Sequence, residues 1–149
     1  MTDIEETHFH DIFNTNVLGL LMTTKIVVAN LNSAGGSVIN ISSLSALGAA
    51  PGRAVYASSK AAVNAITKVL ALELAERKIR VNAIMPGYFD TEGARAFGIK
   101  GTEAETQLLA ATPLEKRPGH PSDRTHNNRL DFRQDSLADS PIQMMLMRR

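Results

Sequence analysis

Three side chains near the middle of the chain have the types and the spacing for acid–base chemistry at a carbonyl group. Ser43 precedes Tyr56 by thirteen positions, and Lys60 follows Tyr56 by four, which places Tyr56 and Lys60 on one helical face. A free phenol has a pKa of about 10, and a neighbouring ammonium group favours the phenolate and lowers that pKa. Ser43 would hydrogen-bond the substrate oxygen and hold it against the phenol. These residues predict a site that reduces a carbonyl or oxidises an alcohol.

The surrounding sequence predicts the elements that hold these side chains. Apolar and small residues predict a long helix over about 5–31, a buried strand over 38–41, a helix over about 55–76 and a second buried strand over 79–84. Strand, helix and strand at this spacing predict two parallel strands with a right-handed crossover. We expect a loop with one or two short helices over 87–111. The first helix has a broad apolar stripe, so we expect it to be covered on more than one side.

Several motifs in the same order resemble the short-chain dehydrogenase/reductase family. They are Asn16 in Phe13-Asn14-Thr15-Asn16-Val17, the strand from Gly35 to Ser43, the pair Tyr56 and Lys60, and the strand and loop from Arg80 to Gly87. Residues 112–114 and 118–121 look like the loop before the family's last helix. The resemblance implies an α/β fold, a partial Rossmann-like doubly wound parallel sheet that holds the catalytic half only, over residues 1–121.

The resemblance also implies a role for each matched residue. Tyr56 is the acid/base, Lys60 lowers its pKa and binds the nicotinamide ribose, and Ser43 orients the substrate oxygen. Asn16 holds a water that links Lys60 to a proton relay. The implied substrate is a small-molecule secondary alcohol or carbonyl compound.

A nicotinamide cofactor, NAD or NADP, follows from the same resemblance. The family places the nicotinamide against the loop Pro86-Gly87, with backbone groups of Phe89 and the Thr91 hydroxyl near its carboxamide. The implied cofactor-binding residues are Tyr56, Lys60, Pro86, Gly87, Phe89 and Thr91. Gly93, Gly98 and Gly101 do not have the spacing of a dinucleotide fingerprint, so we expect no phosphate site there.

Two regions depart from the family pattern. Nothing in the sequence corresponds to the glycine-rich turn that cradles the cofactor pyrophosphate, so we expect weak dinucleotide binding. From Ser122 onward the chain contains no Gly, Val or Lys and no helical or strand period. Codons allowed for 123–129, read from their second base, can encode Ile-Ala-Pro-Ile-Ile-Ile, which is family-like. Residues 122–149 are therefore either a frameshifted tail or a genuinely divergent, disordered one.

Composition limits the remaining function classes. The chain has 149 residues and a formal net charge of +1, which argues against nucleic-acid and membrane-surface partners. It contains no cysteine, which fits a cytoplasmic location. No apolar run in the sequence approaches membrane-spanning length, so we expect no membrane contact. His8 and His10 are two residues apart and face different directions on a helix, so we expect no metal site.

A second function class competes with the enzyme. The chain could be a catalytically inactive family fragment that keeps only a surface for association. The family associates through its two long helices, here 5–31 and 55–76, which predicts a homo-oligomer. Titration with a dinucleotide separates the two hypotheses, since an enzyme of this class must bind a nicotinamide cofactor.

Overall fold

The computed structural model describes residues 4–48, 50–96, 98–110, 118 and 142–145. The chain forms two compact units: Met1–Met85 together with Met145–Arg149, and Pro86–Met144. Asn16, Ser43, Tyr56 and Lys60 all belong to the first unit, whereas the predicted nicotinamide loop, which begins at Pro86, belongs to the second.

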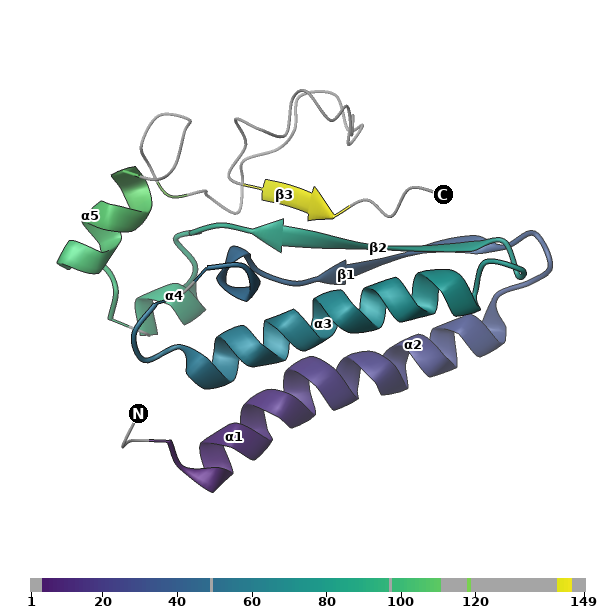
Figure 1. Ribbon diagram of the computed structural model, residues 1–149, viewed down its shortest axis with the longest axis horizontal. Coiled ribbons are helices and arrows are strands. Elements are labelled where there is room, and N and C mark those ends of the chain that lie inside the picture. The colour runs from purple at the N-terminus through teal and green to yellow at the C-terminus, as the bar shows by residue number, and fades with distance from the viewer. Residues whose placement is uncertain (1–3, 49, 97, 111–117, 119–141, 146–149) are drawn as a thin grey trace. The chain divides into compact units, whose positions relative to one another are not determined.

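A nearly continuous helix begins the first unit. It consists of α1 (Glu6–Phe13), a π-helical turn η1 (Asn14–Leu18) and α2 (Gly19–Asn30), as Figure 1 shows. The N–H of Gly19 donates to the carbonyl of Asn14, and a Cβ on Gly19 would lie 3.3 Å from that oxygen. The predicted helix over 5–31 is therefore confirmed, and the π-helical turn within it was not predicted.

A strand–helix–strand unit follows. Strand β1 (Gly36–Ile41) leads through a short 3₁₀ turn η2 (Leu44–Ala46) to helix α3 (Ala54–Glu73) and strand β2 (Ile79–Pro86). The strands pair in parallel, in a register that runs from Gly36 opposite Ile79 to Ile41 opposite Ile84. The predicted α/β fold with a parallel crossover is confirmed.

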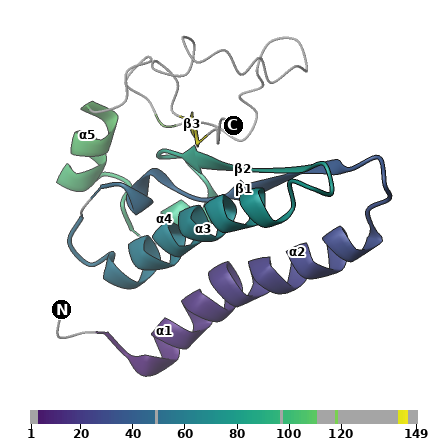
Figure 2. The same cartoon turned by 45° about the vertical axis from the view of Figure 1, so that its right-hand side comes forward.

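Helix α3 lies against the two strands, and the helix formed by α1, η1 and α2 runs along the other side of α3 (Figure 2). One cluster of the core comprises Val28, Ile79 and Val81, packed against the half-buried Leu31, Val38, Leu70, Ala71 and Leu74. Other buried hydrophobic residues are Val55, Val63, Ala83 and Met85. Helix α2 buries only Thr24 and Val28, and Ile26 on the same helix is 65% exposed. The expected cover on more than one side of this helix is therefore not present among the described residues.

The continuous helix from Glu6 to Asn30 is also long and apolar enough to cross a membrane by length and composition, with a mean hydropathy of 1.5. No such span was predicted from the sequence, because polar residues such as Asn14, Asn16 and Lys25 interrupt the apolar ones along this helix. Core helices of soluble proteins meet the same criterion, so the finding does not assign the helix to a membrane.

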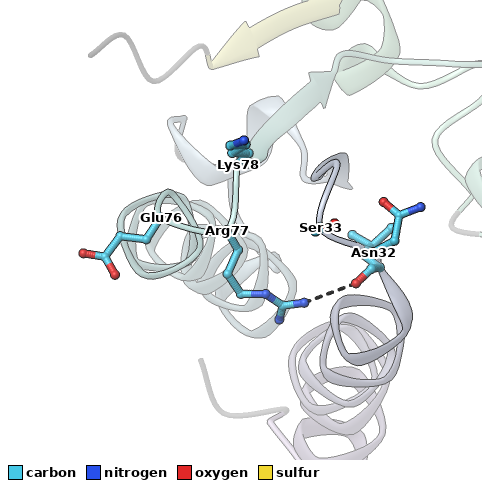
Figure 3. A pocket seen from close by; sticks show the side chains of 6 residues that line it. Asn32, Ser33, Glu76, Arg77 and Lys78 are labelled. Atoms are coloured by element: carbon cyan, nitrogen blue, oxygen red, sulfur yellow. Dashed lines mark hydrogen bonds between the residues drawn. The ribbon is translucent and has the colours of Figure 1, made fainter.

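The connections near the C-terminal end of α3 contain left-handed residues and long-range hydrogen bonds. Gly35 has a φ of 86° and Lys78 a φ of 58°, so both adopt left-handed backbone conformations. The Arg77 guanidinium donates to the carbonyl of Val28 at 2.8 Å and to that of Leu31 at 3.4 Å, which ties the connection after α3 to the end of α2. An open pocket of about 310 Å³, lined in part by Asn32, Arg77 and Lys78, lies here, at the opposite end of α3 from Tyr56 (Figure 3).

The described part of the second unit contains two short helices, α4 (Glu92–Ala96) and α5 (Glu103–Ala110). It also contains the strand β3 (Ile142–Met145) except for the last residue, Met145, which is assigned to the first unit. The helices confirm the expectation for 87–111. Strand β3 lies within the tail for which no strand period was found in the sequence. The rest of that tail lies outside the described residues, as do the family-like motif at 112–114 and residues 119–121.

Candidate active site

The first turns of α3 bring Tyr56 and Lys60 together. The Lys60 ammonium lies 5.9 Å from the centroid of the Tyr56 ring, and both side chains are half-buried. The same ammonium donates to the carbonyl of Ile41, at the end of β1, at 3.0 Å. Burial lowers the pKa of Lys60 below its usual value, because a charged amine is less well solvated there. The predicted phenol–ammonium pair is thus formed and anchored to the sheet.

Ser43 is the second residue after β1 and has an extended backbone conformation. Its hydroxyl oxygen accepts the N–H of Ser45 at 3.2 Å and so caps the short turn η2. A hydroxyl that accepts one hydrogen bond still carries a proton to donate, so this cap is compatible with the predicted bond to a substrate oxygen.

Ser42, the residue before it, was not predicted to matter. Its side chain is 3% exposed, and its hydroxyl donates to the backbone carbonyl of Lys60 at 3.0 Å. Neighbouring residues of an extended segment point to opposite sides, which was the signal in the sequence that could have separated the roles of Ser42 and Ser43.

Asn16 lies in the π-helical turn, and its side chain contacts α3. Its amide nitrogen donates to the hydroxyl of Ser59 at 3.0 Å, and that hydroxyl donates to the backbone carbonyl of Tyr56 at 2.7 Å. Sequence reasoning missed Ser59, although it stands between Tyr56 and Lys60. Asn16 is therefore linked through Ser59 to the backbone of Tyr56, and its role in holding a water that reaches Lys60 remains a prediction.

Buried hydrogen bonds hold α3 to the strands further along the helix. The Asn40 amide of β1 donates to the Thr67 hydroxyl at 2.9 Å, and that hydroxyl donates to the Val63 carbonyl at 2.7 Å. Asn64 donates to the Met85 sulfur at 3.5 Å, and its side-chain oxygen has no partner among the described residues. Because buried polar groups are costly when unpaired, these bonds fix how α3 sits on the sheet.

The predicted nicotinamide loop, in the second unit, is folded by local contacts. The N–H of Thr91 donates to the carbonyl of Phe89 at 2.9 Å, and the Thr91 hydroxyl accepts the N–H of Ala94 at 3.2 Å. Thr91 therefore caps the start of α4, a use that its hydroxyl was not predicted to have. The hydroxyl proton remains free for the predicted contact with a carboxamide.

Two carboxylates organise the segment after this loop. Asp90 pairs with Arg95 at 2.7 Å and with Lys100 at 3.6 Å, and the hydrogen bond from Arg95 holds the pKa of Asp90 below its usual value. Glu105 accepts the Tyr88 hydroxyl at 2.9 Å and the N–H of Gly101 at 2.6 Å. Partial desolvation and the Glu105 carboxylate raise the pKa of the Tyr88 phenol.

Comparison with known proteins supports the assignment that this geometry suggests. Residues 1–125 match the family model described as enoyl-(acyl carrier protein) reductase. An uncharacterized oxidoreductase of Methylorubrum extorquens is 50% identical over 121 residues, which are 81% of this chain and 48% of that protein. The 3-oxoacyl-[acyl-carrier-protein] reductase FabG of Thermotoga maritima is 39% identical over 112 residues, 74% of this chain and 44% of that protein.

The fold of the chain is also similar to that of a solved dehydrogenase structure. The 7α-hydroxysteroid dehydrogenase complexed with NADH and 7-oxo glycochenodeoxycholic acid superposes with a TM-score of 0.72 and 30% identity, covering 80% of this chain and 46% of that chain. The strand–helix–strand unit thus has the α/β fold of this solved dehydrogenase. The chain belongs to the short-chain dehydrogenase/reductase family, and it spans about half the length of the curated relatives that it matches.

Proposed function

We propose that this chain carries the proton-transfer site of an NAD(P)-dependent oxidoreductase that acts on a secondary alcohol or carbonyl compound. The observation that carries the proposal is the Tyr56–Lys60 pair, with the ammonium 5.9 Å from the ring centroid, on a helix that follows the strand ending beside Ser43. A phenol with an adjacent cation is an acid/base, and a nearby hydroxyl is an orienting donor.

In the reducing direction, the Tyr56 hydroxyl gives its proton to the carbonyl oxygen of the substrate. The Ser43 hydroxyl donates a hydrogen bond to the same oxygen and keeps it in line with the phenol. The positive charge of Lys60 stabilises the phenolate that Tyr56 becomes. A bound nicotinamide cofactor supplies the hydride that completes the reduction, and the reverse direction oxidises the alcohol.

The donor set fits the nicotinamide end of such a cofactor. The Lys60 ammonium and the Tyr56 hydroxyl are suited to ribose hydroxyl groups. The ammonium donates to the Ile41 carbonyl at 3.0 Å and carries two further N–H groups that could donate to a ribose. Pro86, Gly87, Phe89 and Thr91 are proposed to line the nicotinamide ring. The residues present do not distinguish NAD from NADP.

Titration of the purified full chain with NADH and NADPH tests this function. We expect weak binding, with a dissociation constant of about 1 mM, since the retained contacts reach only one end of the dinucleotide. Lys60→Met should weaken it further, whereas Lys68→Met, an exposed lysine on the same helix, should not. Absence of any Lys60-dependent binding would favour the inactive fragment, and a constant of about 10 μM or tighter would show that the site is more complete than we propose.

We also propose that the chain associates with itself through the long helices, as the family resemblance implies. Ile26 and Leu72 are 65% and 70% exposed, and Ala65 on α3 is exposed too, so an uncovered apolar surface is present. Ala65→Arg should weaken any oligomer, measured by analytical ultracentrifugation. Thr106→Arg, an exposed position in α5, is the matched control. A parent chain that stays monomeric at high concentration would contradict this proposal.

A further inference from the structure

Two adjacent serines on α3 differ in what their hydroxyls contact. Ser58 is exposed, and its hydroxyl donates to the carbonyl of Val55 at 3.0 Å. Ser59 is fully buried, and its hydroxyl donates to the carbonyl of Tyr56 at 2.7 Å. Each serine thus bonds a carbonyl three residues earlier in the helix, which is a local contact that many helical serines make.

Only Ser59 makes a second, long-range bond. Its hydroxyl oxygen accepts the amide N–H of Asn16, forty-three residues earlier in the chain, at 3.0 Å. A chain of two hydrogen bonds therefore runs from the Asn16 side chain through the Ser59 hydroxyl to the backbone of Tyr56. This chain reaches the helical turn that presents both Tyr56 and Lys60.

The Asn16 end of this chain lies in an unusual piece of backbone. Residues Asn14–Leu18 form a π-helical turn, which is rare and is found mostly as a single turn within α-helices. A turn of this kind gains less from its own hydrogen-bond geometry than an α-helical turn does, so contacts from outside the helix decide where it sits. Within the first unit, η1 packs against α3, and the bond to Ser59 is a polar contact between them.

We propose that Ser59 is a positioning residue: its buried hydroxyl fixes the Asn16 amide and thereby holds the π-helical turn and the Tyr56–Lys60 turn as one rigid unit. The catalytic consequence rests on the proposed function. Ser59 does not touch the reacting atoms, and it acts through the placement of Tyr56. Removing its hydroxyl leaves the Asn16 donor without its acceptor and frees the two turns to move separately.

A spectroscopic experiment on the full chain tests this coupling without any activity. The chain has two tyrosines, Tyr56 and Tyr88, so a sample with ¹³C-labelled tyrosine rings gives two sets of signals that Tyr88→Phe assigns. Ser59→Ala and Asn16→Ala should each displace the Tyr56 signal, and the double variant should displace it no further than either one alone. Ser58→Ala combined with Asn16→Ala is the control, and its displacements should add.

A catalytic experiment follows on the same variants, with NADH or NADPH and a panel of one α-diketone, one cyclic ketone and one 3-oxoacyl thioester. Ser59→Ala should lower kcat about 10- to 100-fold with little change in KM, because misplacing a reacting group by about 1 Å can cost about 100-fold in rate. Ser58→Ala should retain the parent kcat, and Ser59→Thr, which keeps the hydroxyl, should restore part of the loss.

The two experiments fail in distinguishable ways. Additive displacements for Ser59→Ala and Asn16→Ala, or an unmoved Tyr56 signal, would overturn the positioning role whatever the activity. Non-additive displacements in a chain that oxidises no cofactor would support the positioning role and count against the proposed function. A Ser59→Ala variant with the parent kcat would overturn the catalytic consequence.

Discussion

The two units of the molecule use polar side chains in opposite ways. Around Tyr56, buried hydroxyls and amides join elements distant in sequence, as Asn16 joins Ser59 and Asn40 joins Thr67. In the segment after Pro86, the polar contacts are local, and most lie at the surface, as between Asp90 and Arg95. Buried hydrogen bonds define one geometry because a misplaced partner is left unsatisfied, whereas exposed ion pairs are weak and screened by salt. The described part of the first unit is therefore held by buried bonds that favour one arrangement, whereas the described part of the second is held by contacts that cost little to rearrange.

Two glycines with left-handed backbone provide the largest test of this contrast. A Cβ on Gly35 (φ 86°) would lie 2.3 Å from the backbone oxygen of Lys78, whereas a Cβ on Gly101 (φ 79°) would meet nothing within 4 Å. Gly35→Ala should therefore lower the free energy of unfolding by about 3 kcal/mol or more, and Gly101→Ala by about 1 kcal/mol from backbone strain alone. Urea unfolding of both variants measures the difference, and equal losses would contradict the contrast.

A buried hydroxyl in the first unit provides the next test. Thr67 is fully buried, accepts from Asn40 and donates to Val63. Thr67→Val keeps the shape and removes the hydroxyl, which leaves the Asn40 amide unsatisfied and should cost about 1–3 kcal/mol. Thr106→Val in α5, where the hydroxyl is exposed, is the matched control and should change stability little. A loss of stability in Thr106→Val but not in Thr67→Val would contradict the stabilising role of the Thr67 hydroxyl.

Lys60 gives the pH dependence of the site. Burial lowers the pKa of Lys60 below 10.5, so at lower pH the folded state holds a poorly solvated charge, and the unfolded state binds the proton more tightly. The contribution of Lys60 to stability should therefore rise with pH between its folded pKa and 10.5. Stability curves of the parent and Lys60→Met should diverge in this alkaline range, with the parent rising more steeply. Parallel curves would show that Lys60 is fully solvated.

The smallest expected effect comes from the exposed ion pairs. Asp90 has a lowered pKa owing first to its hydrogen bond with Arg95, so its contribution is present above 3.8 and is lost as the pH falls through its folded pKa. Asp90→Asn should speed amide exchange over residues 90–100 at low salt and have little effect at high salt. Exchange at Val63 and Thr67 should not change. A change in exchange at Val63 and Thr67 as well would mean that the ion pairs of Asp90 stabilise more than residues 90–100, which would contradict the contrast.

The sequence predicted those features that depend on local pattern. Periodicity and turn residues located both long helices, both parallel strands and the short helices after Pro86, and spacing located Ser43, Tyr56 and Lys60. The π-helical turn was missed because it differs from an α-helix only in its hydrogen-bond register, which no residue pattern marks. Ser42 and Ser59 were missed because a serine beside a catalytic residue looks like any small helix or strand residue until its partner, Lys60 or Asn16, is known.

The exposed apolar surface shows a different limit of prediction. The apolar stripe of the first helix predicted cover, yet Leu18, Met22 and Ile26 are about half or more exposed among the described residues, at 49%, 46% and 65%. Periodicity reports that a face is apolar and does not report what covers it. What covers an apolar helix face depends on other chain segments or partners, which the periodicity of the helix itself does not describe.

Turnover by the parent chain and by Tyr56→Phe tests the central claim most directly. The assay follows NADH or NADPH oxidation by the full chain with the carbonyl panel described above, and Tyr88→Phe is the control because it removes the other tyrosine hydroxyl. We predict that Tyr56→Phe lowers the rate by about 100-fold or more, since the proton donor is lost, and that Tyr88→Phe remains active. A Tyr56→Phe variant that keeps more than about a tenth of the parent rate would contradict the assignment of Tyr56 as the acid/base.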